Sequence, residues 1–522
     1  MNKYATDVVI IGAGIAGLVT ALELAKNNKS ILVVDAQPEA DCGGLANVAF
    51  GGMALIDTPE QRSKKIKDSP EIAYEDWLRY AELGSGDHWA RQWAKYYAEN
   101  SISEVYEYIR GFGVKFIPTV NWAERGETVV GNSVPRYHIL WGCSLYLIER
   151  LKLALKPYIG KQIQFHFNTR ITELLSQNSH ITGCRSETTE YHSEAVVIAT
   201  GGFGGNMETV KKYWPSDWPG LKQNILNGNH PSNDGHMHTE ASKAGAVLNN
   251  MHNMWNYAAG IEHPQPQFDN HGLSIIPCRS ALWVDHLGKR LMPPLVGGLD
   301  TQLLCERIND AQIPQSWQIL NRRIALKELA ISGAEHNPSI RDRTYWGLLK
   351  ELIRGNRWLV DKMCAESDEF IVADTVAELA KKMQAFSPEY KLDKHLIASE
   401  LAKFDSEMRL GEQSKDFQVA TIHSVRHYFV DKLRTAKAKA ISDDLPLIAI
   451  RLRLVTRKSM GGITTNNHSQ ALNASNEVIN GLYTVGEAAG FGGGGASGKR
   501  SLEGTFLSGC IMTARQAARS LS

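Results

Sequence analysis

The sequence predicts an α/β fold, with a parallel sheet assembled from both ends of the chain and a second, α+β domain inserted between them. The first observation is an apolar, strand-like run that leads into a G-x-G-x-x-G motif at Gly12, a helical stretch, and a second apolar run ending in Asp35. The second is a short apolar run at 190–200, typical of a fully buried parallel strand. Strand and glycine patterns return in 443–522. Together these patterns favour a Rossmann-like unit.

The N-terminal glycine motif has the context of a dinucleotide-binding βαβ unit. Gly12 permits the tight turn, Gly14 lets the backbone approach a pyrophosphate, and Gly17 lets the helix lie close to the strand. The phosphates would bind at the helix N-terminus, where free N–H groups and the helix dipole favour anions. Asp35 is placed to accept hydrogen bonds from ribose hydroxyls. The alternative is a glycine-rich turn in an unrelated α/β protein.

Composition and charge exclude several classes of protein. The chain has 522 residues, and its formal net charge of +1 favours neither nucleic acid nor an anionic membrane as a partner. No apolar stretch is long enough for a transmembrane helix, and the glycine motif interrupts the N-terminal apolar run, unlike a signal peptide. The seven cysteines are scattered singly, without metal, haem or iron–sulfur spacing. We therefore expect a cytoplasmic protein with reduced thiols and no metal site.

Changes in composition and periodicity along the chain predict two domains formed by three segments. Residues 1–262 and 443–522 should form the nucleotide-binding domain, and 263–442 a capping or substrate domain rich in prolines and charged helices. Within the capping domain, amphipathic periodicity predicts helices at 306–329, 345–363 and 392–408.

A helical stretch at 71–112 is rich in tryptophan and tyrosine. Its aromatic residues could be interpreted as a ligand cage, but their helical spacing favours a buried helix face. The residues concerned are Trp89, Trp93, Tyr96 and Tyr97.

The segments that follow the first βαβ unit favour FAD over a nicotinamide cofactor. A nicotinamide domain would continue with further βαβ repeats. Here two glycine pairs follow instead, Gly43-Gly44 and Gly51-Gly52. A buried strand later ends in Ala199-Thr200-Gly201, and a C-terminal segment carries Gly486-Glu487. An extended dinucleotide held by both chain ends matches this pattern, with Glu487 bonding ribitol hydroxyls or capping a nearby amide.

These motifs resemble the flavoprotein superfamily of fumarate reductases and 3-ketosteroid 1-dehydrogenases. The segments Gly486–Gly495 and Arg500–Leu507 are most similar to its branch of bacterial FAD-binding dehydrogenases. The resemblance covers nearly the whole chain and implies a split FAD domain with a lobe closing over the flavin. It also implies a cofactor contact for Asp234. The predicted cofactor-binding residues are Gly12, Gly14, Ala16, Gly17, Asp35, Ala36, Gly43, Gly44, Gly51, Gly52, Ile171, Ala199, Thr200, Gly201, Asp234, Gly486, Glu487, Ser501 and Leu502.

Departures from the family pattern narrow the expected chemistry. Arg457 and Lys458 stand where fumarate reductases carry histidines, and Ser501 stands at their substrate-binding arginine. Fumarate reduction is therefore not expected. Quinone-linked relatives attach FAD through a histidine about where Leu45 lies, so the resemblance implies non-covalent FAD.

Four residues are predicted to act in catalysis: Arg457, Lys458, Arg500 and His138. The glycine-rich run near Arg500 is expected to lead into a helix that starts near Leu502. The dipole of this helix would stabilise negative charge on the reduced flavin. The alternatives are solvated charges for the basic residues and a buried structural role for His138. Ketosteroid dehydrogenases use tyrosines as acid and base; Arg500 occupies about the place of one, and the remaining candidates are Tyr137, Tyr257 and Tyr428.

The sequence thus predicts an FAD enzyme that transfers a hydride between flavin N5 and a substrate carbon, at a C–C bond next to a carbonyl or carboxylate. An oxygen-using oxidase or hydroxylase and a non-catalytic FAD-binding redox protein stay open as alternatives. The expected partners are a small-molecule substrate and an electron donor or acceptor that the sequence does not identify. The sequence is silent on oligomeric state.

Overall fold

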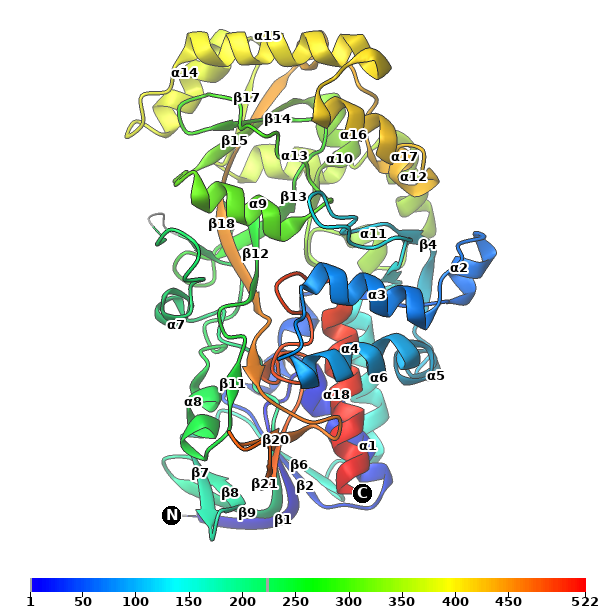
Figure 1. Cartoon of the computed structure of the whole chain (residues 1–522), viewed down its shortest axis with the longest axis vertical. Coiled ribbons are helices and arrows are strands. Elements are labelled where there is room, and N and C mark those ends of the chain that lie inside the picture. The colour runs from blue at the N-terminus through cyan, green and yellow to red at the C-terminus, as the bar shows by residue number, and fades with distance from the viewer. Residues whose placement is uncertain (1, 222–224) are drawn as a thin grey trace.

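The computed structural model describes residues 2–221 and 225–522 and places two eight-stranded sheets at opposite ends of an elongated molecule (Figure 1). Strands from both chain ends form the first sheet, near the two termini. The second sheet lies in the middle and upper part of Figure 1, under helices of the central segment.

The first sheet has the order β20-β21-β9-β1-β2-β6, with β7 and β8 attached beside β9. Strands β21, β9, β1, β2 and β6 run parallel. They pair because their apolar residues are buried on both faces, as in Val8–Ile11 of β1. The strands are β1 (Asn2–Ile11), β2 (Ile31–Val34), β6 (Ile163–His166), β7 (Glu173–Gln177), β8 (His180–Arg185), β9 (Thr189–Ile198), β20 (Gln470–Leu472) and β21 (Val478–Thr484).

Helices from distant parts of the sequence cover one face of this sheet. Helix α1 (Ile15–Lys26) packs between α6 (Cys143–Leu155) and the C-terminal helix α18 (Thr505–Leu521). Their apolar faces share one core with α3 (Pro70–Ala81) and α4 (His88–Ser101). The predicted Rossmann-like α/β unit built from both chain ends is therefore confirmed.

The second sheet has the order β14-β15-β18-β12-β13-β16, with β10 and β17 also paired to β18. Its longest strands, β12 and β18, run antiparallel and reach back toward the first sheet. Residues 1–262 and 443–522 thus supply three strands of the second sheet, β10, β12 and β18. The sequence did not predict this, because the burial pattern of an apolar strand does not tell which sheet the strand joins. The strands are β10 (Leu226–Asn227), β12 (Met254–Glu262), β13 (Gly272–Ile276), β14 (Leu282–Asp285), β15 (Ser316–Asn321), β16 (Ala330–Ile331), β17 (Phe370–Ala373) and β18 (Leu447–Ser459).

The predicted helix at 306–329 is wrong. The structure has α9 (Thr301–Asp310), strand β15, and α10 (Arg322–Glu328) there. All six residues of β15 are buried because the strand lies between β14 and β18. The helix predicted at 345–363 is two helices, α12 (Tyr345–Arg354) and α13 (Arg357–Glu366), divided at Gly355 with φ +84°. Helix α15 (Lys394–Leu410) confirms the prediction at 392–408.

Smaller elements complete the chain. One small sheet has the order β3-β5-β4, and β11 pairs with β19. The remaining elements are β3 (Gly52–Ala54), β4 (Phe116–Asn121), β5 (Tyr137–Leu140), β11 (Leu248–Asn249), β19 (Gly462–Ile463), α2 (Pro59–Ser63), α5 (Glu107–Gly111), α7 (Met207–Lys212), α8 (His236–Lys243), α11 (Pro338–Arg341), α14 (Val376–Phe386), α16 (Phe417–Val425) and α17 (Phe429–Arg434).

Candidate active site

The turn between β1 and α1 has the geometry that its three glycines predict. Gly12 has φ +109°, and a Cβ there would overlap the Ala199 carbonyl oxygen. A Cβ on Gly17 would overlap the Gly12 carbonyl oxygen, because the helix packs directly on the turn. A Cβ on Gly14 would meet no atom within 4 Å. The space outside Gly14, at the N-terminus of α1, therefore suits a phosphate group.

Asp35 lies at the carboxyl end of β2, beside this turn. Its Oδ2 accepts a hydrogen bond from the Ala13 N–H at 2.6 Å, and its Oδ1 accepts one from the Gln37 N–H at 2.7 Å. Both bonds orient the carboxylate at the edge of the sheet. The predicted ribose contact of Asp35, and the contact of its neighbour Ala36, stay predictions.

The other predicted glycine segments gather around the same edge. The Gly43 N–H donates to the Ala13 carbonyl at 2.8 Å. The loop that begins at Ala199 is joined to β1 through an Ala199 N–H bond to Ile11 at 2.8 Å. The C-terminal segment is joined through a Val485 N–H bond to Ile198 at 3.0 Å. Backbone from both chain ends thus forms one continuous, side-chain-poor track, which fits an extended FAD.

The Gly51-Gly52 pair lies against strand β5 and the start of α6. Gly51 has φ +89°, and a Cβ there would crowd the Ser144 N–H. A Cβ on Gly52 would overlap the hydroxyl of Tyr137. Gly52 therefore lets a tyrosine side chain lie directly on the backbone.

Three further predicted contacts have defined surroundings. Ala16 lies close to the Gly486 backbone, since a Cβ on Gly486 would be 3.0 Å from the Ala16 Cβ. Ile171 is buried in the core on the other face of the sheet. Asp234 accepts hydrogen bonds from Arg170 at 2.6 Å and from the His236 N–H at 2.9 Å, at the start of α8. Their contacts with cofactor stay predictions.

A polar cluster, formed by Lys458, Glu503, Tyr257 and Trp255, lies between β12, β18 and the loop before α18. Trp255 is buried, and the other three are half-buried. Glu503 accepts hydrogen bonds from Trp255 Nε1 at 2.6 Å and from the Tyr257 hydroxyl at 3.0 Å. Lys458 Nζ lies 4.2 Å from the Phe506 ring centre and 6.0 Å from that of Tyr257. We call this group the Lys458–Glu503 cluster.

Burial controls the protonation of the Lys458–Glu503 cluster. It lowers the pKa of Lys458, an effect that the Glu503 charge opposes. Burial and the same carboxylate raise the pKa of Tyr257 well above its usual value. A tyrosine hydroxyl that donates to a carboxylate near an amine can exchange protons, which is the composition expected of a catalytic centre.

Tyr137 forms the wall of the cluster on the side of Gly52. Burial, followed by the charge of Glu503, raises its pKa. Tyr428 is engaged elsewhere, since its hydroxyl donates to the Val120 carbonyl. The structure therefore brings two of the three candidate tyrosines, Tyr137 and Tyr257, to Glu503.

Glu487 lies directly behind Lys458. Its Oε1 accepts a hydrogen bond from the Ser459 N–H at 2.9 Å and one from the Ser459 hydroxyl at 3.2 Å. Burial raises its pKa, against the opposing effect of Lys458. Of the two roles predicted for Glu487, the structure contains the amide cap.

The four residues predicted to act in catalysis do not lie together in the structure. Of the four, only Lys458 belongs to the Lys458–Glu503 cluster. Arg457, its neighbour, donates to the Gly228 carbonyl at 2.7 Å. His138 has both ring nitrogens engaged, with Nδ1 2.7 Å from the Arg136 carbonyl and Nε2 2.8 Å from the Thr58 hydroxyl. Burial lowers its pKa to about 4, so it is neutral near pH 7 and has no free nitrogen for a substrate.

Arg500 is held by two carboxylates. It pairs with Glu82, which follows α3, and with Asp300 before α9 at 3.2 Å. Burial disfavours its charge, but Asp300 and Glu82 more than offset this and raise its pKa. These carboxylates neutralise the charge that we expected at the flavin edge, and the ion pairs join the C-terminal segment to Glu82 and Asp300.

The helix expected near Leu502 begins later. Helix α18 starts at Thr505, after Gly504 with φ +104°. Leu502 is buried, and the Ser501 hydroxyl lies 2.9 Å from that of Thr505, so both precede the helix. Glu503 consequently lies in the loop, where it reaches the cluster. Sequence reasoning missed Glu503, although its position inside the glycine-rich C-terminal motif was a usable signal.

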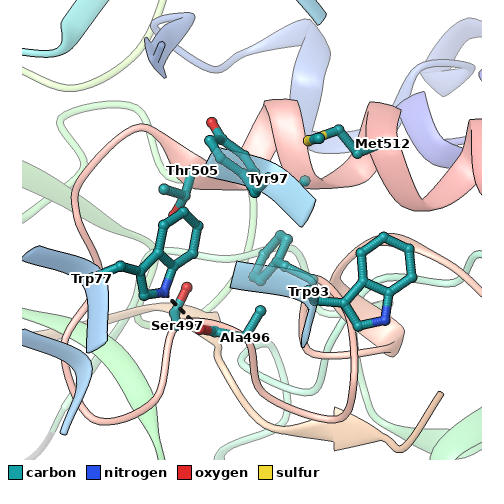
Figure 2. A pocket seen from close by; sticks show the side chains of 9 residues that line it. Trp77, Trp93, Tyr97, Ala496, Ser497, Thr505 and Met512 are labelled. Carbon is teal, nitrogen blue, oxygen red and sulfur yellow. Dashed lines mark hydrogen bonds between the residues drawn. The ribbon is translucent and has the colours of Figure 1, made fainter. Parts of the chain in front are cut away.

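The aromatic residues of α3 and α4 hold the glycine-rich loop in place (Figure 2). Trp77 Nε1 donates to the Ala496 carbonyl at 2.7 Å. Trp93 fills the space that a Cβ on Gly492 would need, and the Tyr97 hydroxyl donates to the Ala54 carbonyl at 2.6 Å. Trp93 and Tyr97 are buried, whereas Trp89 and Tyr96 are half-buried, so the predicted buried helix face is confirmed for two of its four residues. Their packing around a small apolar cavity fixes the backbone that leads to Glu503.

The sequence predicts no metal site, but three possible ligands meet in the central segment of the chain. Ligand atoms of His263, Glu335 and His336 lie within 4.8 Å of one another. Nδ1 of His263 accepts a hydrogen bond from the Gln265 N–H at 3.0 Å. Nε2, 3.7 Å from Glu335, therefore carries the ring proton and offers no lone pair to a cation.

All seven cysteines are free thiols. Among the described residues, no helix is both long and apolar enough to cross a membrane.

Comparisons with known proteins agree with this geometry. The "FAD binding domain" family matches residues 7–507. A KsdD-like steroid dehydrogenase of Mycobacterium tuberculosis is 36% identical, over 98% of this chain and 95% of that protein.

Solved structures share the fold. The 3-ketosteroid Δ1-dehydrogenase of Sterolibacterium denitrificans, in complex with 1,4-androstadiene-3,17-dione, has a TM-score of 0.73 at 15% identity, over 99% of both chains. A flavocytochrome c3 fumarate reductase in an open conformation has a TM-score of 0.70 at 20% identity, over 99% of this chain and 78% of the other. The predicted superfamily and cofactor are confirmed: the chain belongs to the FAD binding domain family, as an FAD-dependent oxidoreductase of the fumarate reductase and ketosteroid dehydrogenase type.

Proposed function

We propose that this enzyme dehydrogenates a flat, apolar ketone of the steroid type, introducing a C=C bond next to the carbonyl. The observation that carries the proposal is the Lys458–Glu503 cluster, which adjoins the glycine track between the two domains. It places a proton-exchanging pair, Tyr257 and Glu503, near one half-buried cation, Lys458. Bound FAD supplies the two-electron acceptor for this chemistry.

The residues of the cluster have separable roles in this proposal. The Tyr257 hydroxyl exchanges the proton at the carbon next to the carbonyl, and Glu503, 3.0 Å behind it, takes up that proton. Lys458 stabilises negative charge as it gathers on the substrate oxygen. Tyr137, Trp255 and Phe506 supply the apolar and aromatic walls.

The substrate class follows from the balance of charge and apolar surface. A dicarboxylate needs several free cations, and here Arg500 is paired with carboxylates while Arg457 bonds a backbone carbonyl. One half-buried lysine flanked by aromatic rings suits a single carbonyl oxygen on an apolar body. The similarity to a KsdD-like steroid dehydrogenase supports this choice.

The test is anaerobic reduction of the flavin. The FAD-loaded protein is mixed with a 4-ene-3-ketosteroid, with succinate, or with buffer, and the visible flavin absorbance is followed. We expect the steroid to bleach the flavin and to lose two hydrogens, as judged by mass spectrometry. Bleaching by succinate alone, or oxidation of the reduced flavin by fumarate but not by a 1,4-diene-3-ketosteroid, would contradict the proposal.

The cofactor is proposed to be non-covalent, because no histidine occurs in 45–52. Acid precipitation should therefore release all of the FAD into the supernatant. We propose a cytoplasmic location from the seven free cysteines. A separate electron acceptor must reoxidise the flavin.

A further inference from the structure

Helix α12 presents an apolar face to solvent. None of its ten residues is buried. The exposed fractions are 69% for Tyr345, 82% for Trp346, 41% for Leu349 and 70% for Ile353. A contiguous set of large apolar side chains at such exposure is unusual for a surface helix and marks an interaction site.

The exposure follows from the helical spacing. Tyr345, Trp346, Leu349 and Ile353 are at positions i, i+1, i+4 and i+8, on one side of the helix. The opposite side is anchored, since Leu348 packs against the cluster of Ile117, Ile139 and Cys143. The helix is therefore fixed in place while its apolar face points outward.

A row of cations flanks the apolar face. Lys350, Arg354 and Arg357 are exposed. The one acidic residue in 343–358 is Glu351, which is half-buried and accepts a hydrogen bond from the Ser339 hydroxyl. The local charge of this surface is thus clearly positive, although the whole chain has a formal net charge of +1. Helix α17 packs beside α12 and adds the exposed ring of Phe429.

We propose that α12 docks this enzyme on the surface of an anionic phospholipid bilayer. Trp346 and Tyr345 would lie at the level of the headgroups, Leu349 and Ile353 would enter the acyl boundary, and the cations would face lipid phosphates. The chain then lies on the membrane without crossing it.

Charge distinguishes a bilayer from a second copy of the chain. A two-fold contact through α12 would bring Lys350 and Arg354 against the same residues of the other copy. An anionic bilayer neutralises these cations instead, with each basic residue near the surface contributing about 1 kcal/mol. The binding should therefore weaken as salt is raised.

The docking face is close to the candidate active site. Leu348, on the inner side of α12, packs on the same cluster as Tyr137, which lines the Lys458–Glu503 cluster. An apolar compound dissolved in the bilayer would thus be delivered next to the site. The docking itself does not depend on the proposed function, because it rests on the surface of α12 alone.

The experiment is co-sedimentation of the FAD-loaded full chain with vesicles. The vesicles are phosphatidylcholine alone or an equal mixture of phosphatidylcholine and phosphatidylglycerol. We compare the wild type with the double variants Trp346→Ser/Ile353→Ser and Lys350→Glu/Arg354→Glu. The matched control is Leu410→Ser, because Leu410 is 50% exposed at the end of α15.

We expect the wild type and Leu410→Ser to bind the anionic vesicles, and both double variants to bind at least tenfold more weakly. Melting temperature and FAD content should be unchanged in all variants, which separates loss of docking from misfolding. Absence of wild-type binding, binding that both double variants retain, or a lipid-free dimer that the Trp346→Ser/Ile353→Ser variant dissociates would each overturn the proposal. If one double variant fails to fold, the other variant and the salt dependence of wild-type binding decide.

Discussion

The glycine track and the Lys458–Glu503 cluster belong to one site, but they are specified in different ways. The track is fixed by backbone that leaves no room for side chains, as at Gly12 and Gly17. The cluster is fixed by side chains from three separate segments that meet only after folding. We therefore expect changes in the track to act on folding and cofactor binding, and changes in the cluster to act on chemistry.

The largest effect should come from Gly17→Val. Its side chain would overlap the Gly12 carbonyl oxygen and force α1 away from the sheet that it covers. We expect loss of the cooperative thermal transition and of bound FAD, measured by calorimetry and by flavin absorbance.

Gly14→Val is the control for this prediction. A Cβ at Gly14 meets no protein atom within 4 Å. The apo-protein should melt near the wild-type temperature, whereas FAD affinity should fall on the order of a hundredfold, about 2.7 kcal/mol. A Gly14→Val protein that binds FAD as tightly as the wild type would show that the phosphates lie elsewhere.

The next largest effect should come from Glu503→Gln. The amide keeps the shape of the side chain but cannot take up a proton from Tyr257. We expect kcat to fall by on the order of 10²- to 10³-fold, with FAD content and melting temperature close to those of the wild type. Stopped-flow bleaching of the flavin by substrate measures the chemical step directly.

Tyr257→Phe is the companion variant for Glu503→Gln. If the two residues act as one proton-exchanging pair, the double variant should be no slower than the slower single variant. Fully additive losses would contradict the pairing.

The same contrast explains what the sequence could predict. Gly12, Gly17 and Gly43 were identifiable because a glycine at a tight turn or close packing point leaves a local signature. Glu503 was not, because its role depends on Trp255 and Tyr257, nearly 250 residues away in the chain. The helix predicted at 306–329 failed for a related reason, since burial between two neighbouring strands determines that Ser316–Asn321 is extended.

Arg500→Gln tests whether this residue holds distant segments of the chain together or acts in catalysis. Loss of the guanidinium leaves Asp300 buried without its cation, beside Glu124, whose pKa is already raised to about 8 by burial and then by Asp300. Breaking such a buried pair should lower the free energy of unfolding by about 3 kcal/mol. Melting temperature measures this, and turnover per bound flavin should change less than tenfold.

Asp300→Asn is the partner change for this prediction. Combined with Arg500→Gln, it should restore part of the lost stability, because it removes the unpaired carboxylate. A hundredfold loss of turnover per flavin in Arg500→Gln, with unchanged melting, would instead place Arg500 in the catalytic machinery.

The smallest effect concerns the pH dependence of stability through His138. Burial lowers its pKa from 6.5 to about 4 in the folded chain. Between these values the unfolded chain binds the extra proton, so His138 lowers the free energy of unfolding as pH falls from 6.5 toward 4, by up to about 3 kcal/mol. His138→Gln should flatten this part of the melting profile while leaving the pH dependence of kcat unchanged, because the ring is engaged by Arg136 and Thr58 rather than by substrate. The prediction would be contradicted if stability depended on pH in the same way in both proteins. It would also be contradicted if an inflection in the pH profile of kcat disappeared in the variant, which would show that His138 acts in catalysis.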